Sequence, residues 1–164
     1  MHLAWIYTNR IAWVTRKKRS KGCLFCRIAR GDKRIPARIL HKDEHLLVVM
    51  NEFPYNTGHL IVTPIKHVKN LDELSEEEIA KLFLMVRRCI KLLKKALKPR
   101  GFNVGLNIGE FAGASVEHLH VHIVPRFKTD FGFMEIVART KVMPESLEET
   151  CKRLMRYAKI LRGE

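Results

Sequence analysis

The stretch EHLHVHIVPR, residues 117–126, constrains this chain more than any other. It places His118, His120 and His122 at alternate positions, with an apolar residue in each gap. Successive side chains of a β-strand point to opposite faces, so the spacing predicts a strand with three imidazoles on one face. At about 3.3 Å per residue, the outer two lie roughly 13 Å apart. Three such imidazoles are badly placed to share one metal ion, whose ligand bonds are about 2 Å long.

The same row of imidazoles favours phosphate chemistry. It follows the glycine-rich stretch NIGEFAGAS, residues 107–115. A neutral imidazole can attack phosphorus near neutral pH, while a neighbouring imidazole donates a proton or hydrogen bond. Histidines that only decorate an exposed sheet remain the alternative interpretation, but random placement rarely gives three in register.

The hydrophobic pattern elsewhere predicts a mainly antiparallel α+β domain. Ser75 and Glu78 have the spacing of a capping box, which marks the start of a helix. Alternating apolar runs and turn residues mark the strands. The expected elements are strands at 37–43, 45–51 and 58–64, a helix from Ser75 to about Leu97, strands at 102–109 and 118–126, and a helix after Pro144.

Length and composition indicate one globular domain. The chain has 164 residues, of which 46% are hydrophobic and 29% charged. No apolar run approaches the roughly 18 residues of a membrane span, and no secretory signal is evident, so we expect a cytoplasmic protein without membrane contact. We expect residues 1–14 to pack on the domain, with Trp5 and Trp13 filling core. The lack of Gln beside many Lys, Arg and Glu residues leans toward a thermophile.

The net charge of +14 is unevenly distributed. Residues 10–38 hold eleven Lys and Arg residues against the single acid Asp32. Such a run attracts polyanions, among them nucleic acid and polyphosphate ligands, although a solvated basic surface is the plainer interpretation. A nucleotide- or nucleic-acid-binding module without turnover is therefore the alternative to an enzyme.

The four cysteines divide into two kinds. Cys89 and Cys151 lie at apolar positions of predicted helices, so we expect them in the core. Cys23 and Cys26 form a close pair that suggests metal binding, with two unpaired thiols in a turn as the alternative. Read alone, this pair with His41 and His45 passes for a zinc finger. A finger needs both histidines on a helix, whereas their surroundings predict strand, turn and strand.

The segment from about Cys23 to Arg126 resembles the histidine triad family of nucleotide hydrolases and transferases. The resemblance rests on CLFCRIARGD, on ARILHKDEHLLVVMNEFPYNTGHLIVTPIKH and on NIGEFAGASVEHLHVHIVPR, in that order. It implies a five-stranded, mainly antiparallel sheet with a long helix and a C-terminal helix, usually in a homodimer whose sheets join. It implies one domain over 1–164, with a basic N-terminal extension (1–22), a core (23–126) and a C-terminal extension with a helix (127–164).

The resemblance also implies a reaction. Purine nucleotide substrates, here most simply dinucleoside polyphosphates, would be cleaved at the α-phosphate through a covalent nucleotidyl-histidine. His120 would be the nucleophile and His122 would assist the leaving group. Supporting roles fall to the α-phosphate ligands Asn107, Gly113 and Ser115, to Asn51 at the ribose, and to His59 behind the triad.

In the zinc-bearing branch of the family, and in the related galactose-1-phosphate uridylyltransferases, residues matching Cys23, Cys26, His67 and His118 hold one zinc. Four protein ligands close its coordination shell, so this metal would be structural. The chain departs from the hydrolase members at Ala114, where they usually carry Gln. An Ala at this position resembles the diadenosine tetraphosphate phosphorylases, in which inorganic phosphate accepts the nucleotidyl group. The acceptor in this protein is therefore left as either water or inorganic phosphate.

Overall fold

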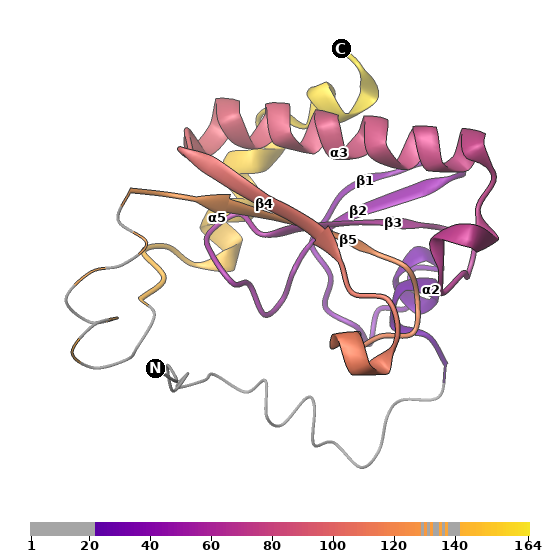
Figure 1. Ribbon diagram of the computed structural model, residues 1–164. Coiled ribbons are helices and arrows are strands. Elements are labelled where there is room, and N and C mark those ends of the chain that lie inside the picture. The colour runs from indigo at the N-terminus through magenta and orange to yellow at the C-terminus, as the bar shows by residue number, and fades with distance from the viewer. Residues whose placement is uncertain (1–21, 129, 131, 133–134, 136, 138–141) are drawn as a thin grey trace.

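The computed structural model describes residues 22–128, 130, 132, 135, 137 and 142–164 (Figure 1). The predicted packing of residues 1–14, including Trp5 and Trp13, lies outside this part of the chain. Within it, no helix is both long and apolar enough to cross a membrane.

One antiparallel sheet forms the centre of the fold and confirms the predicted α+β class. Its spatial order is β1-β2-β3-β5-β4. The strands are β1 (Ile39–Lys42), β2 (Leu46–Met50), β3 (Leu60–Pro64), β4 (Gly101–Leu106) and β5 (Val121–Arg126). The hairpin of β1 and β2 and the closure of β3 by Pro64 agree with the sequence pattern.

All five strands are shorter than predicted, and β5 and β4 show the physical reason. β5 begins at Val121 rather than at His118, because the preceding segment bonds outside the strand ladder. The Leu119 amide donates to the Val68 carbonyl at 2.7 Å, and the Thr63 hydroxyl donates to the Leu119 carbonyl at 2.8 Å. β4 ends at Leu106, the residue paired with Val121, because β5 offers no partner beyond that point.

The long helix α3 (Glu76–Leu97) covers one face of the sheet, as Figure 1 shows. Its capping box is formed as predicted, with the Glu78 amide donating to the Ser75 hydroxyl at 3.2 Å. α5 (Leu147–Met155) follows Pro144, and the 3₁₀ helix η3 (Ala158–Arg162) packs along α3. Cys89 is fully buried in this layer, whereas Cys151 is half-buried against it.

The opposite face of the sheet carries α2 (Leu24–Ala29), a six-residue helix that the sequence pattern did not predict. Neither did it predict the short 3₁₀ turns η1 (Leu71–Glu73) and η2 (Glu110–Ala112). Phe25 and Ile28 of α2 pack on Leu47, Val49 and other side chains that point away from α3. Because α2 is short, it covers only part of this face and leaves room for a pocket.

Candidate functional site

A pocket of about 240 Å³ lies between α2 and the sheet. Its walls are mostly apolar, with His120 and His122 at the end next to β5, which we call the polar end. The lining residues are Leu24, Phe25, Ile28, Ile35, Pro36, Ala37, Val49, Met50, Asn51, Glu52, Phe53, Tyr55, Ile61, Asn107, Gly113, Ser115, Val116, His120 and His122. An apolar slot with convergent polar groups at one end suits a ligand with a flat apolar part and a polar part.

His120 has a fixed ring orientation in this pocket. Only 4% of the residue is exposed, and its Nδ1 lies 2.6 Å from the His118 carbonyl oxygen. A carbonyl can only accept, so Nδ1 carries the proton and the lone pair is on Nε2. Burial lowers the pKa of His120, which favours the neutral imidazole. The ring is therefore held in the form that can act as a nucleophile.

His122 stands beside His120, with ring centroids 4.8 Å apart. Its Nδ1 lies 3.0 Å from Nε2 of His59, a residue that is 1% exposed. The Tyr55 amide donates to Nδ1 of His59 at 3.1 Å, and the Asn51 side-chain nitrogen lies 3.2 Å from the same atom. Because Nδ1 of His59 accepts, its Nε2 carries the proton and donates to His122. Neutral His122 then keeps its own proton on Nε2.

Asn51 has a second role beyond its place in the pocket lining. Its side-chain oxygen accepts from the Phe53 amide at 3.0 Å, which is the turn geometry expected of asparagine after a strand. This turn and the contact with His59 both tie the loop after β2 to the histidines.

The three residues expected to bind phosphate also meet at the polar end. Asn107, Gly113 and Ser115 all line the pocket, from the connection between β4 and β5. Gly113 adopts a positive φ of 86°, and its carbonyl accepts from the Asn107 side chain at 3.5 Å. All three belong to the single connection between β4 and β5, and their binding of phosphate stays a prediction.

The four predicted metal ligands form a compact cluster. One ligand atom from each of Cys23, Cys26, His67 and His118 lies within 4.8 Å of the others. Nδ1 of His118 is 3.1 Å from the Cys23 sulfur, 3.6 Å from the Cys26 sulfur and 3.3 Å from Nδ1 of His67. Bonds of about 2.0–2.3 Å from a tetrahedral metal place ligand atoms roughly 3.3–3.8 Å apart, so the cluster fits a metal site.

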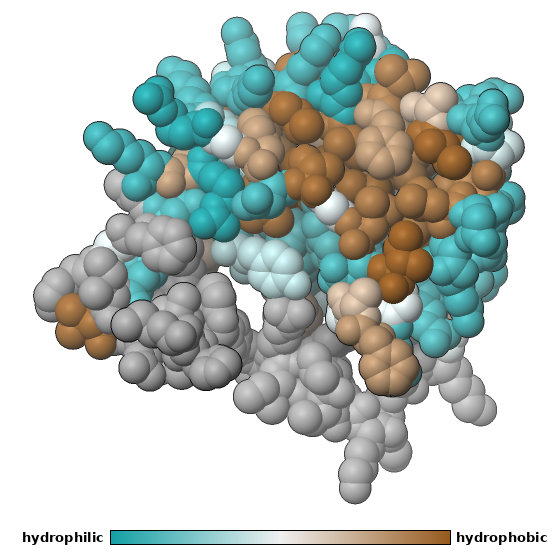
Figure 2. Space-filling model, in the orientation of Figure 1, coloured by the Kyte–Doolittle hydropathy of each residue, from teal (hydrophilic) through white to brown (hydrophobic). Residues whose placement is uncertain are grey.

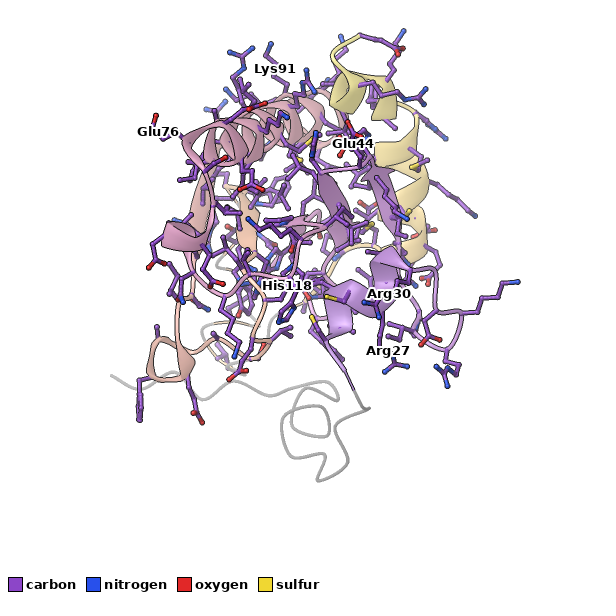
Figure 3. All side chains as sticks on the ribbon, turned by 90° about the vertical axis from the view of Figure 1, so that its right-hand side faces the viewer. Arg27, Arg30, Glu44, Glu76, Lys91 and His118 are labelled. Carbon is purple, nitrogen blue, oxygen red and sulfur yellow. The ribbon has the colours of Figure 1, made fainter. Side chains whose placement is uncertain are left out.

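The buried ligand of this cluster is prepared for metal binding. Nε2 of His118 donates to the Pro64 carbonyl at 2.9 Å, so the lone pair is on Nδ1, which faces the two thiols. Burial lowers the pKa of His118 and favours the neutral ring that a metal binds. Figure 3 shows His118 below the sheet, close to α2.

The zinc-finger interpretation is wrong. His41 lies on β1 and contacts Asp43 at 3.0 Å, and His45 lies in the turn before β2. Neither belongs to the Cys23 and Cys26 cluster, which takes its histidines from much later in the chain.

Two aromatic residues of the site were not predicted. Phe25 lies between the metal-site cluster and the pocket, with its ring 5.6 Å from His118 and 5.1 Å from His120. Tyr55 stacks on His59 at 4.9 Å and is 43% exposed. In the sequence, Phe25 is next to Cys26 and Tyr55 is four residues before His59, and this closeness was the only signal for a role in the site. The signal is weak, because single aromatic residues are most often part of the core.

With this geometry in place, comparison with known proteins identifies the class. The HIT domain matches residues 32–129, and the chain belongs to this family. The AP-4-A phosphorylase of Mycobacterium tuberculosis is 42% identical over 113 residues, which are 68% of this chain and 58% of that protein. The chain thus spans less than two thirds of the length of this relative.

Two further proteins bear on the site. Adenosine 5'-monophosphoramidase hnt1 of Schizosaccharomyces pombe is 34% identical over 110 residues, covering 67% of this chain and 78% of its own. The crystal structure of a Zn-bound histidine triad family protein from Mycobacterium smegmatis has a TM-score of 0.72 at 28% identity. It covers 88% of this chain and 99% of that one.

Proposed function

We propose that this protein is a nucleotidyl hydrolase or transferase. It cleaves dinucleoside polyphosphates, or related purine nucleotide conjugates, at the α-phosphate, with water or inorganic phosphate as the acceptor. The observation that carries the proposal is the fixed neutral His120, whose Nε2 lone pair stands beside His122 at the polar end of an apolar pocket. The names of the phosphorylase and phosphoramidase relatives support a nucleotide substrate.

In the first step, Nε2 of His120 attacks the α-phosphorus and the bond from phosphorus to the leaving oxygen breaks. The leaving polyphosphate oxygen keeps the bonding electron pair as an anion, His122 donates an Nε2–H hydrogen bond to it, and His59 holds His122 in the required tautomer. In the second step, the acceptor oxygen attacks phosphorus, the electron pair of the phosphorus–nitrogen bond returns to Nε2 of His120, and a water acceptor releases its proton to solvent.

The rest of the pocket binds the nucleotide. Asn107, Ser115 and the backbone at Gly113 hold the α-phosphate oxygens as charge develops on them. The apolar walls take the purine, and Asn51 reaches the ribose hydroxyls with the hydrogen-bonding capacity left by its turn. No Lys or Arg lines the pocket among the described residues, so the site relies on neutral donors and histidines.

We further propose that Cys23, Cys26, His67 and His118 hold a structural zinc. Its four protein ligands leave no open position for water, so its contribution is to fix α2 and the segment before β5. The zinc-bound neighbour and the compact ligand cluster support this assignment.

The domain organisation and assembly are also proposals. We propose a single histidine triad domain over residues 1–164, with 23–126 as its core and extensions at 1–22 and 127–164. We propose a homodimer whose sheets join along β4, supported by the exposed apolar residues on that strand and on α3.

The acceptor is tested by incubating the purified chain with diadenosine tetraphosphate, with and without inorganic phosphate, and identifying the products. ADP and ATP formed only with phosphate would identify a phosphorylase, which Ala114 and the mycobacterial relative favour. AMP and ATP formed in both conditions would identify a hydrolase. Turnover of neither this substrate nor an adenosine phosphoramidate would refute the proposal.

The nucleophile is tested with His120→Ala. Turnover should fall by roughly 10³-fold or more, while nucleotide still binds because the phosphate and ribose contacts remain. His45→Ala, at an exposed histidine of the β1–β2 turn, is the matched control and should keep full activity. A nucleotide label trapped on any residue other than His120 would contradict the covalent step.

A further inference from the structure

The positive charge of this chain is unevenly placed in the fold. Three of the five described cations between residues 22 and 38 are ion-paired: Arg27 and Arg34 with Asp32, and Arg38 with Glu52. The described part of the basic stretch that first suggested a polyanion partner is thus partly neutralised by neighbouring carboxylates.

The second half of α3 differs from this pattern. From Val86 to the C-cap residue Lys98, it contains no Asp or Glu. Its cations are Arg87, Arg88, Lys91, Lys94, Lys95 and Lys98, and all but Arg88 are exposed. Within the described part of the chain, none of them forms an ion pair.

The 3₁₀ helix η3 extends this surface. Arg88 donates to the Leu161 carbonyl at 3.2 Å, which brings the neighbouring Arg162 close to α3. Arg162 and Lys159 are exposed and form no ion pair with a described carboxylate. We define the α3–η3 basic face as Arg87, Arg88, Lys91, Lys94, Lys95, Lys98, Lys159 and Arg162. Figure 2 shows hydrophilic side chains along the edge of the molecule where α3 and η3 lie.

Helix stability alone does not explain this arrangement. The helix dipole favours cations in the last turn, which accounts for Lys94, Lys95 and Lys98 but not for Arg87 and Lys91. Arg87, Lys91 and Lys95 follow one another at intervals of four residues, a spacing at which like charges repel. In the first half of α3, the residues four apart carry opposite charges: Lys81 pairs with Glu77 at 2.9 Å. A counter-charge from outside the described chain would relieve this repulsion.

We propose that the α3–η3 basic face binds the phosphate backbone of a nucleic acid duplex. At 1.5 Å per residue, Arg87 to Lys98 extends about 16 Å, enough to follow several phosphates. The exposed Phe83 and Leu84 of α3 lie in the turn before Arg87, outside the row of cations, so no aromatic side chain lies along the row for unpaired bases to stack on. A duplex therefore fits the row better than a single strand or a lipid bilayer.

The position of the face allows both activities in one molecule. Lys91 lies on the helix layer, whereas Arg30 and His118 lie on the other side of the sheet (Figure 3). A duplex bound along α3 therefore leaves the nucleotide pocket open, and the interaction does not depend on the proposed reaction.

The test is fluorescence anisotropy of a labelled DNA duplex of about two helical turns, titrated with the full chain between roughly 50 and 200 mM KCl. Lys91→Glu with Lys95→Glu should weaken binding at least about tenfold and lower the salt slope by roughly two. Arg30→Glu with Lys33→Glu makes the same change in net charge at exposed positions on the α2 side of the sheet. This control should lose less than about threefold.

Three results would overturn the proposal: no duplex binding by the unaltered chain, equal losses in both double variants, or binding to anionic phospholipid vesicles in place of the duplex. Lys91→Gln with Lys95→Gln should give an intermediate loss without introducing new acids. Unchanged thermal midpoints and nucleotide turnover in the α3 variants would assign their loss of duplex affinity to the face itself. A large fall in the midpoint of the glutamine variant would instead assign the loss to unfolding.

Discussion

At the scale of single residues, the three histidines of the triad differ because of their backbone partners. The His118 carbonyl fixes the proton on Nδ1 of His120, and the Pro64 carbonyl fixes the proton on Nε2 of His118. The Tyr55 amide has the corresponding effect on His59, and through it on His122. Identical side chains thus acquire different protonation patterns, which their alternate spacing alone does not specify.

The pairing of His59 with His122 gives the next prediction. His59→Asn should lower turnover by roughly 10²-fold, because His122 loses the donor that keeps its own N–H on Nε2, facing the leaving group. The loss should be smaller for a nucleotide substrate whose leaving group is less basic and needs this hydrogen bond less. Kinetics with both substrate types measure this difference. Equal losses on both would show that His59 only supports the fold, and His45→Asn should change neither.

At the scale of elements, α2 and the turn after it are joined to the rest of the fold by charged side chains and by the candidate metal ligands. Asp32 accepts from Arg27 at 2.9 Å and from the backbone and side chain of Arg34 at 3.1 and 2.9 Å. The hydrogen bonds from Arg34 and then Arg27 hold the pKa of this carboxyl well below its usual range. The ionised form is thus stabilised in the folded protein.

The contribution of Asp32 to the free energy of unfolding should depend on pH. A carboxyl whose pKa is lower in the folded than in the unfolded state stabilises the fold above the unfolded value of about 3.9, and this contribution is lost as pH falls further. Asp32→Asn should therefore lower the free energy of unfolding at pH 7, and the difference should shrink below about pH 4. Urea unfolding at pH 7 and below about pH 4 measures this difference. As a control, Asp72→Asn changes an exposed carboxylate of η1 and should have little effect on the free energy of unfolding at either pH. If Asp32→Asn lowered this free energy equally at both pH values, the ionic explanation would be contradicted.

The proposed zinc makes a second prediction for α2. Cys23→Ser should lose about one zinc per chain and lower the thermal midpoint, because the ligand that begins α2 no longer joins the helix to His118. Elemental analysis of protein purified without added metal gives the stoichiometry. Cys151→Ser, at a half-buried thiol outside the cluster, should retain the metal. Full zinc content in the Cys23→Ser protein would refute the ligand set.

These elements also mark what the sequence could and could not predict. The start of α3 was predictable because its capping box is local, with Ser75 and Glu78 three residues apart. The start of β5 was not, because it depends on the Val68 carbonyl, which is distant in sequence. α2 was missed because six residues show little periodicity and its stability comes from docking. The grouping of His67 with Cys23 likewise came from family resemblance, since spacing alone gave the wrong histidines.

At the scale of the whole molecule, the main core and the candidate site lie on opposite faces of the sheet. The α3 side holds the main core, while the α2 side holds the histidines, the pocket and the metal-site cluster. β5 belongs to both, since Val121 and Ile123 enter the core and His122 enters the pocket. The packing of Val121 and Ile123 in the core therefore holds His122 in place at the pocket.

One edge of the sheet remains open in the single chain. β4 pairs with β5 on one side, and no described strand pairs with the other side. Figure 2 shows a brown, hydrophobic area on the side of the molecule that carries β4 and α3 in Figure 1. Phe83, Leu84, Val104 and Ile108 are 44%, 49%, 42% and 40% exposed, respectively. An open edge with apolar neighbours is a pairing site for another strand.

A second copy of the chain is the occupant that symmetry favours. A twofold axis perpendicular to the sheet pairs β4 antiparallel with its own copy and places the same apolar residues on both sides of the contact. The unaltered chain should therefore have a solution mass near twice 19.1 kDa by light scattering. Val104→Lys should shift it to the single-chain mass, because a lysine on an edge strand opposes pairing.

The control for this prediction is Met155→Lys. Met155 is 47% exposed and lies on α5, so a lysine there adds the same charge away from the β4 edge and should leave the dimer intact. Phe83→Lys provides an independent disruption from α3. A dimer that survives both Val104→Lys and Phe83→Lys would exclude this edge as the contact. A monomeric unaltered chain would exclude the homodimer itself. If the dimer forms as expected, the two sheets continue across the axis and both nucleotide pockets open on the same face, because the axis crosses the sheet without exchanging its sides.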